Sequence, residues 1–256
     1  MLNYEDPEGP LFSGSFVAGV PSVADSMTVV SYNIHFAQDP QQAVDDLSNL
    51  AVIDLLLLQE ADERAVELIA RALAMDFIYY PVSVHNRHDR NFGNAILSRW
   101  PLSEPAKIIL PHRNPRNDQM RAATRAVVEF GSEEILVYSV HTETSWLGYR
   151  KRLEQIDALL ESVEPGVDLV IIAGDFNTLS PGSKSDLEDR FGRAGMLNAT
   201  RDLGGTTKHP LASITLDYIF TRGMSIDSAG KFVGADASDH LPIWVQMKPD
   251  NAGHIE

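Results

Sequence analysis

The sequence predicts a mixed α/β fold, because short apolar runs typical of buried strands alternate with segments whose apolar residues recur every three or four positions. A second observation is that several of the apolar runs end at a polar residue. Buried strands form short continuous apolar runs, and ligand sites in α/β proteins gather beyond strand ends. We therefore expect one pocket lined by carboxylates, amides and two histidines.

The first half of the chain alternates predicted strands and helices. The first strand begins at Met27, and its apolar run ends before Asn33. Helical spacing of apolar residues predicts helices over residues 40–50 and 62–75. The leucine run before Gln59-Glu60 lies between these helices and is predicted to be a buried strand.

The second half contains most of the predicted strands. Strands are expected over residues 93–98, 122–130, 134–141 and 168–173, and Gly131-Ser132 predicts that the middle two form a hairpin. Residues 146–163 have helical spacing. Asp217 opens a short apolar run, and a last strand over residues 243–247 follows Ser238-Asp239-His240.

The chain length allows one large domain or two small ones, and no linker divides it. We expect one domain over residues 27–248, preceded by an extension over residues 1–26 and followed by a tail over residues 249–256. The extension is rich in Gly, Ser and Pro and lacks a periodic apolar pattern, so its removal should leave stability nearly unchanged.

Composition excludes several classes of protein. The chain has no cysteine, which removes disulfides, thiolate metal sites and a cysteine nucleophile. Its N-terminus carries acids where a secretory signal needs basic residues, and no apolar run approaches membrane-spanning length. These features predict a cytoplasmic protein without a transmembrane segment, and no obligate protein partner is evident.

The net charge of -15 opposes non-specific attraction to nucleic acid. The charge is uneven, however, because residues 85–125 carry eight Lys/Arg and three Asp/Glu, a local balance of 8 - 3 = +5. Two interpretations have equal weight: solvated loops, or a rim that faces phosphate.

The polar residues at the strand ends form an ordered series: Asn33, Gln59-Glu60, His141, Gly174-Asp175-Phe176-Asn177, Asp217-Tyr218 and Ser238-Asp239-His240. This order resembles the endonuclease/exonuclease/phosphatase superfamily over roughly residues 27–247. The resemblance implies a deoxyribonuclease I-like, four-layer sandwich of two stacked mixed sheets flanked by helices. It also implies a metal-dependent phosphoric ester hydrolase.

Phosphate ester hydrolysis requires neutralised phosphoryl oxygens and an activated water, which a hard divalent cation and a positioned base supply. Glu60 and Asn33 offer the oxygen ligands that Mg²⁺ or Mn²⁺ prefers, and the resemblance places the metal on them. Asp239 is predicted to be a further ligand.

The catalytic residues are predicted to be His240, Asp175, Asn177, His141 and Asp217. A carboxylate bonded to one imidazole nitrogen fixes the tautomer, and the resemblance pairs Asp217 with His240 in this way. It assigns Asp175 and Asn177 to water orientation and transition-state contact, and His141 to phosphate. Either Asp175 or His240 is the general base.

The substrate is predicted less sharply than the chemistry. His35 stands where abasic-site endonucleases carry Asp, which favours a small, lipid or sugar phosphate over duplex DNA. Candidate substrate contacts are His35, Arg113, Arg116, Arg121 and Arg125. The alternatives are a nuclease acting on short or single-stranded nucleic acid, and a catalytically silent binding module.

Overall fold

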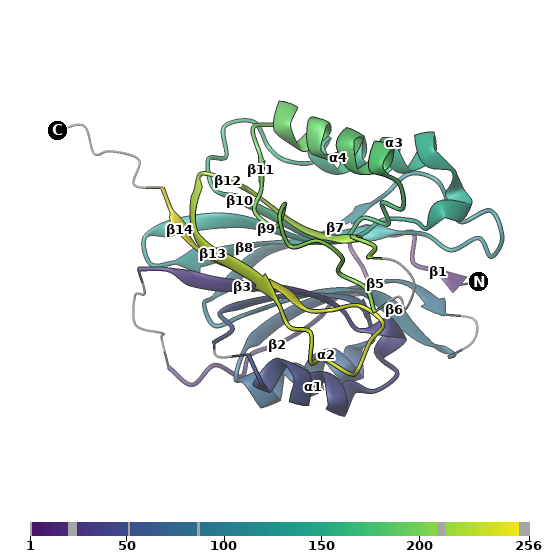
Figure 1. Ribbon diagram of the computed structural model, residues 1–256. Coiled ribbons are helices and arrows are strands. Elements are labelled where there is room, and N and C mark those ends of the chain that lie inside the picture. Colours follow the sequence, from purple (N-terminus) through teal and green to yellow (C-terminus); the bar gives the residue numbers. More distant parts are fainter. Residues whose placement is uncertain (1, 20–24, 51, 86–87, 209–212, 251–256) are drawn as a thin grey trace.

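The computed structural model describes residues 2–19, 25–50, 52–85, 88–208 and 213–250. Two mixed β-sheets are stacked face to face, and a pair of helices covers the outer face of each (Figure 1). This four-layer arrangement confirms the predicted fold class. The continuous apolar runs of the strands follow from it, since a strand inside the sandwich is covered on both faces.

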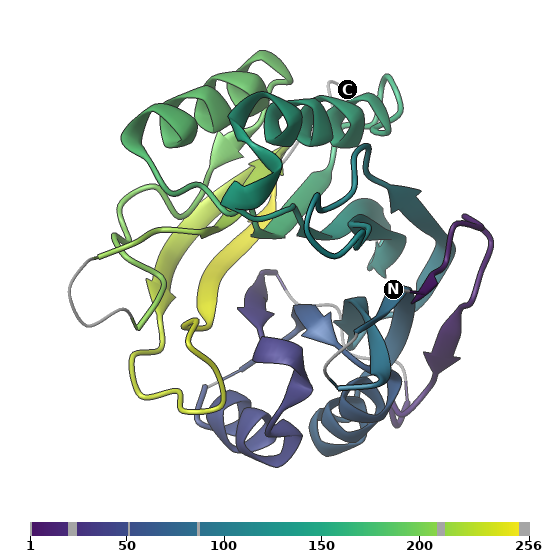
Figure 2. The ribbon, with the colours of Figure 1, turned by 90° about the vertical axis from the view of Figure 1, so that its right-hand side faces the viewer.

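The first sheet has the order β1-β5-β6-β4-β3-β14-β13, with β2 also paired to β5. Its strands are β1 (Leu2–Asn3), β2 (Phe12–Gly14), β3 (Met27–Asn33), β4 (Leu55–Ala61), β5 (Asp76–His85), β6 (Arg90–Ser98), β13 (Met224–Lys231) and β14 (Ile243–Pro249). Its outer face is covered by α1 (Pro40–Ser48) and α2 (Glu63–Leu73), which lie at the bottom of Figure 2.

The second sheet has the order β11-β12-β10-β9-β8-β7. Its strands are β7 (Leu102–Ile109), β8 (Ala122–Phe130), β9 (Glu133–His141), β10 (Val170–Asp175), β11 (Leu197–Asn198) and β12 (Asp217–Arg222). The helices α3 (Tyr149–Glu161) and α4 (Pro181–Arg193) cover its outer face at the top of Figure 2. Short 3-10 turns, η1 (His35–Ala37) and η2 (Ser145–Leu147), follow β3 and β9.

Alternation along the strands builds the apolar layers. In β4, Leu55 and Leu57 face the core between the sheets, whereas Leu56 and Leu58 face the core under α1 and α2. Each of these leucines is fully buried, which stabilises the fold by about 1.5–3 kcal/mol per side chain. A third cluster fills the space under α3 and α4.

Parallel pairing brings the ends of the central strands together. β3 pairs in parallel with β4, which places Asn33 opposite Gln59 and beside Glu60. β9 pairs in parallel with β10, which places His141 opposite Asp175, and Asp175 also lies opposite Asp217 of the antiparallel β12. Polar residues far apart in the sequence are thus collected at one edge of the sandwich.

The N-terminal segment differs from expectation. β1 and β2 extend the first sheet, and Phe12 and Phe16 pack against the core under α1 and α2. These strands are two and three residues long, which is too short for an alternating pattern to be recognised in the sequence. The boundaries of the predicted domain, extension and tail stay predictions, and residues 251–256 lie outside the described part of the chain.

Candidate active site

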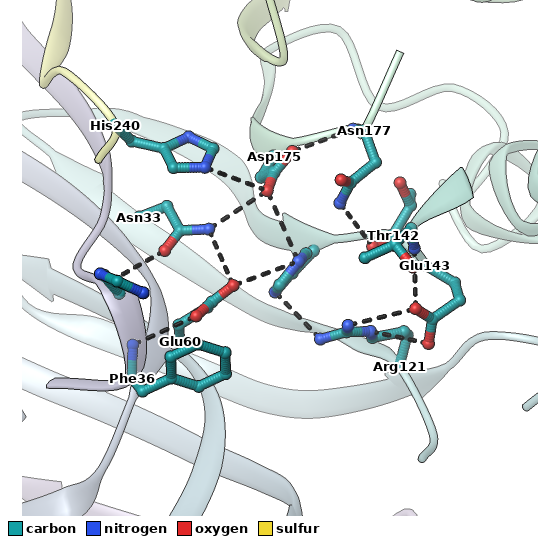
Figure 3. A network of polar contacts seen from close by, with 12 residues as sticks. Asn33, Phe36, Glu60, Arg121, Thr142, Glu143, Asp175, Asn177 and His240 are labelled. Atoms are coloured by element: carbon teal, nitrogen blue, oxygen red, sulfur yellow. Dashed lines mark hydrogen bonds and ion pairs between the residues drawn. The ribbon is translucent and has the colours of Figure 1, made fainter. Parts of the chain in front are cut away.

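Two carboxylates, the largely buried Glu60 and the buried Asp175, face one another across an amide at the ends of β3, β4 and β10 (Figure 3). Asn33 Nδ2 donates to Glu60 Oε1 at 3.2 Å and to Asp175 Oδ2 at 3.1 Å. Burial raises the pKa of Glu60, and it raises the pKa of Asp175 to about 7. The two carboxylates therefore meet in a setting that a positive charge would stabilise.

His141 lies against both carboxylates. Its Nε2 is 3.5 Å from Asp175 Oδ2 and 3.8 Å from Glu60 Oε1, while Arg121 Nη1 is 3.3 Å from its Nδ1. A guanidinium can only donate, so Nδ1 of His141 accepts and Nε2 carries the hydrogen. Burial and the charge of Arg121 hold the pKa of His141 well below its ordinary value. His141 is therefore a neutral donor at Nε2.

His240 lies between two acids. Its Nδ1 is 2.9 Å from Asp217 Oδ2, and its Nε2 is 3.8 Å from Asp175 Oδ2. Asp217 also accepts from the Thr206 hydroxyl at 2.6 Å. Burial alone would lower the pKa of His240, but Asp217 outweighs it and raises the pKa to about 10. The imidazole is thus held as a cation that points at Asp175.

The turn after β10 places Asn177 beside this group. Its backbone N–H donates to Asp175 Oδ1 at 2.9 Å, and its Nδ2 donates to the Thr142 carbonyl at 3.1 Å. Gly174 has φ 151, and a Cβ there would lie 1.8 Å from the Val140 carbonyl oxygen. Only glycine permits this close approach of β10 to β9.

A left-handed turn follows β3 and lies next to Glu60. His35, Phe36 and Ala37 all have φ near +50°, a conformation that costs about 1–2 kcal/mol per residue. Site residues hold it, because Asn33 Oδ1 accepts from the His35 N–H and Glu60 Oε2 accepts from the Phe36 N–H. The strained turn is thereby coupled to the two side chains predicted to bind metal.

Asp239 and the predicted basic contacts are more scattered. Asp239 is 66% exposed and reaches His35 Nδ1 at 3.7 Å, outside the group around Glu60. Arg121 is buried beside His141, and Arg116 stacks on Trp146. Arg113 pairs with Glu5 and Asp118. Arg125 pairs with Glu104 and Glu164 and is not brought to the site.

Several supporting residues were missed in the sequence. Glu143 is fully buried, binds the Arg121 guanidinium at 3.1 Å and accepts from Asn114 at 3.0 Å. Asp46 on α1 accepts from the backbone N–H groups of Asp236 and Ala237, which fixes the loop before His240. Glu143 is two residues beyond His141 and could have been found by its position, whereas nothing in the sequence links Asp46 to that loop.

The donor set suits a hard cation. Ligand atoms of Glu60, His141 and Asp175 lie within 4.8 Å of one another. Since Nε2 of His141 carries a hydrogen, the donors left in this group are carboxylate oxygens, the type that Mg²⁺ and Mn²⁺ prefer. Asn33 directs its Oδ1 to the His35 N–H, so its role as an oxygen ligand stays a prediction.

Comparisons with known proteins identify a matching family and similar sequences. The family model described as Endonuclease/Exonuclease/phosphatase family matches residues 30–240. Among curated proteins, a UPF0294 protein of Vibrio cholerae is 28% identical over 116 residues, which are 45% of this chain and 41% of that protein. One from Vibrio vulnificus is 26% identical over 113 residues, covering 44% and 39%. The chain thus spans about two fifths of the length of these relatives.

Solved structures share the fold at low sequence identity. An endonuclease/exonuclease/phosphatase from Beutenbergia cavernae has a TM-score of 0.72 at 19% identity, over 89% of this chain and 72% of that chain. D. rerio TDP2 complexed with single strand DNA product has a TM-score of 0.67 at 20% identity, over 88% and 100%. None of the helices in the described part of the chain has the length and apolar character needed to cross a bilayer.

Proposed function

The chain belongs to the endonuclease/exonuclease/phosphatase family, and from this premise we propose that it is a divalent-metal-dependent phosphoesterase. The observation that carries the proposal is the series of contacts from Asp217 through His240 to Asp175. Asp175 Oδ2 accepts from the Asn33 amide at 3.1 Å, and the same amide donates to Glu60 at 3.2 Å. A purely binding scaffold has no need of a buried imidazolium held between two acids. The silent-module alternative therefore has less support.

The proposed roles follow from protonation. His240, held as a cation by Asp217, would stabilise negative charge on the phosphoryl group. Asp175, whose pKa is about 7, is suited to accept a proton from water near neutral pH, so we assign it the role of general base. His141 would donate its Nε2 hydrogen to a phosphoryl oxygen, and Asn177 would orient the water.

We propose Mg²⁺ or Mn²⁺ as the cofactor. Glu60 would hold the cation, and Asn33 and Asp239 are the further oxygen donors proposed from the sequence. When bound, the cation would neutralise negative charge on the phosphoryl group. The closeness of the Glu60 and Asp175 carboxylates supports this assignment, because burial and the neighbouring carboxylates raise the pKa of Asp175, and a bound cation would offset both effects.

A small, lipid or sugar phosphate is the proposed substrate class. The net charge of -15 opposes a long polyanion, and Arg113 and Arg125 are already paired with acids. Of the predicted basic contacts, Arg121 acts through His141, while His35 and Arg116 stay proposals. The second candidate is a nuclease that acts on short single strands. The observation in its favour is the structural likeness to TDP2 complexed with single strand DNA product.

The test is a metal-dependent screen with bis-p-nitrophenyl phosphate, oligonucleotides and phospholipids. We expect hydrolysis that chelation abolishes and that Mg²⁺ or Mn²⁺ restores. Asp175→Asn should lower turnover by about 10²–10⁴. Full activity in excess chelator would refute the metal assignment. No hydrolysis of any phosphate ester by the metal-loaded wild type would refute the proposed function.

A further inference from the structure

A surface of exposed apolar and basic side chains borders the site on the side of the second sheet. We call Arg116, Trp146, Tyr149, Arg150, Lys151 and Leu179 the basic-apolar rim. Trp146 is 55% exposed, Leu179 50% and Tyr149 40%, so all three belong to the exposed large apolar residues of the described chain. Single exposed apolar residues are ordinary, but a cluster beside a site indicates an interaction surface.

Three segments from different parts of the chain form this rim. Arg116 lies over the Trp146 ring, 3.1 Å from its centroid. The segment before Leu179 is tied to the segment before Trp146, because Asn177 Nδ2 donates to the Thr142 carbonyl. Tyr149 and Thr178 line the same small hollow between α3 and α4. The rim is therefore one continuous surface, anchored to the loops that carry Asn177 and His141.

The basic residues of the rim are not neutralised within the protein. Arg116, Arg150 and Lys151 form no ion pair with any residue among those the structure describes. Arg150 and Lys151 lie in the first turn of α3, where the helix dipole disfavours cations, and that turn contains no acid. The positive charge of these three side chains contrasts with the net charge of -15, and the more distant acids of the chain are screened beyond about 10 Å at ordinary ionic strength.

We propose that the basic-apolar rim docks the protein on an anionic phospholipid bilayer, with the site facing the lipid headgroups. Trp and Tyr side chains favour the boundary between water and acyl chains, a leucine can insert beyond it, and Arg and Lys pair with lipid phosphates. Docking itself does not depend on the proposed function. Hydrolysis of the docked lipid, in contrast, rests on the proposed phosphoesterase function.

A nucleic acid partner fits the same surface less well. Binding to single strands relies on open aromatic faces on which successive bases stack. One face of Trp146 is covered by Arg116, and Leu179 has no ring to offer. The apolar exposure at Leu179 and Trp146 is instead what insertion into a bilayer uses.

The test is co-sedimentation of the full chain with phosphatidylcholine vesicles, with and without phosphatidylglycerol. We expect binding that requires the anionic lipid and weakens with salt. Arg150→Gln with Lys151→Gln should lower partitioning about 20-fold or more, since each cation contributes about 1 kcal/mol. Trp146→Ser with Leu179→Ser should lower it at least tenfold. Leu197→Ser, equally exposed beyond the end of α4, and Arg193→Gln are matched controls and should bind as wild type does.

Two further measurements keep the outcomes distinct. Hydrolysis of soluble bis-p-nitrophenyl phosphate and the melting temperature should be unchanged in both rim double variants, neither of which replaces Arg116, and this excludes misfolding. Absence of vesicle binding by the wild type, or equal binding by rim and control variants, overturns the proposal. Tighter, rim-dependent binding to a single-stranded oligonucleotide would also overturn it. Vesicle binding without hydrolysis of any ester would refute the proposed function and leave docking intact.

Discussion

At the residue scale, hydrogen-bond partners decide which of the two site histidines carries charge. The Arg121 guanidinium lies beside the His141 imidazole, and its positive charge keeps His141 neutral. His240 lies between the carboxylates of Asp217 and Asp175, which keep it protonated. Their positions at strand ends could be predicted from the sequence. Their protonation could not, because it depends on Arg121, which comes from the loop before β8 and approaches His141 only in the folded chain.

The first prediction concerns the pKa of His240, measured in the presence of a chelator so that no metal ion is bound. Its folded pKa of about 10 exceeds the unfolded value of 6.5, so its stabilising contribution is complete below pH 6.5 and is lost as the pH rises through 10. An NMR titration of the imidazole should show this raised pKa, and Asp217→Asn should lower it. Stability of the wild type that does not fall between pH 8 and 10, relative to His240→Gln, would contradict the assignment.

The second prediction concerns the buried pair of Arg121 and Glu143, which are 3.1 Å apart and almost fully buried. Arg121→Gln should cost about 3–5 kcal/mol of unfolding free energy, because it leaves the Glu143 carboxylate buried without a counterion. Arg121→Gln with Glu143→Gln should recover much of that loss in denaturant titrations. Both variants should still lose activity, since neither fixes the His141 tautomer through a guanidinium. Full activity in the double variant would remove Arg121 from its positioning role.

At the scale of elements, the strands that can be predicted from the sequence are those with a continuous apolar run. β3, β4, β9 and β10 were predicted because both of their faces are buried. The helix α4 was missed because its buried face consists of Ser183, Leu187 and Phe191 amid polar residues, too few for a periodic signal. The predicted helix over residues 146–163 is divided at Gly148, whose φ of 87 ends η2 before α3 begins.

The third prediction tests how α1 positions the loop that carries His240. Asp46 is buried and accepts hydrogen bonds from Tyr32, Gln42 and the backbone of residues 236 and 237. Burial alone would raise the pKa of Asp46, but these hydrogen bonds outweigh burial and lower the pKa. Asp46→Ala should therefore cost about 3 kcal/mol at neutral pH and lower turnover by displacing the loop.

The neighbouring Asp45→Ala is the matched control, because Asp45 is exposed on the same helix and bonds only within α1 among the described contacts. Since the folded pKa of Asp46 lies below its unfolded value, its contribution is present above the unfolded pKa and is lost as the pH falls through the folded one. The stability difference between wild type and Asp46→Ala should accordingly shrink below about pH 4. Equal stability of the two variants at pH 7 would show that the loop is fixed by other contacts.

At the scale of the whole molecule, the sandwich has an edge that the N-terminal segment covers. Phe12 lies 5.9 Å from the Tyr79 ring, and Phe16 lies 6.2 Å from the Phe77 ring, between ring centroids. The Asp76 carboxylate accepts from the backbone N–H groups of Phe16 and Val17. A segment that looks like a disposable extension in the sequence is thus held to β5 by side chains and backbone.

The last prediction follows from that packing and reverses what composition alone suggests. Deleting residues 1–19 would uncover β5 and expose the Phe77 and Tyr79 rings, and the loss of the partly buried Phe12 and Phe16 side chains costs at most about 1.5–3 kcal/mol each. We expect a clear fall in the denaturation midpoint, and Phe12→Ala should reproduce part of it. Leu11→Ser is the matched control, because Leu11 is 40% exposed beside Phe12 and its replacement should have little effect. The active-site residues lie on other strands, so turnover at low temperature should survive the deletion. An unchanged midpoint in the truncated protein would show that β1 and β2 contribute nothing to the stability of the sandwich.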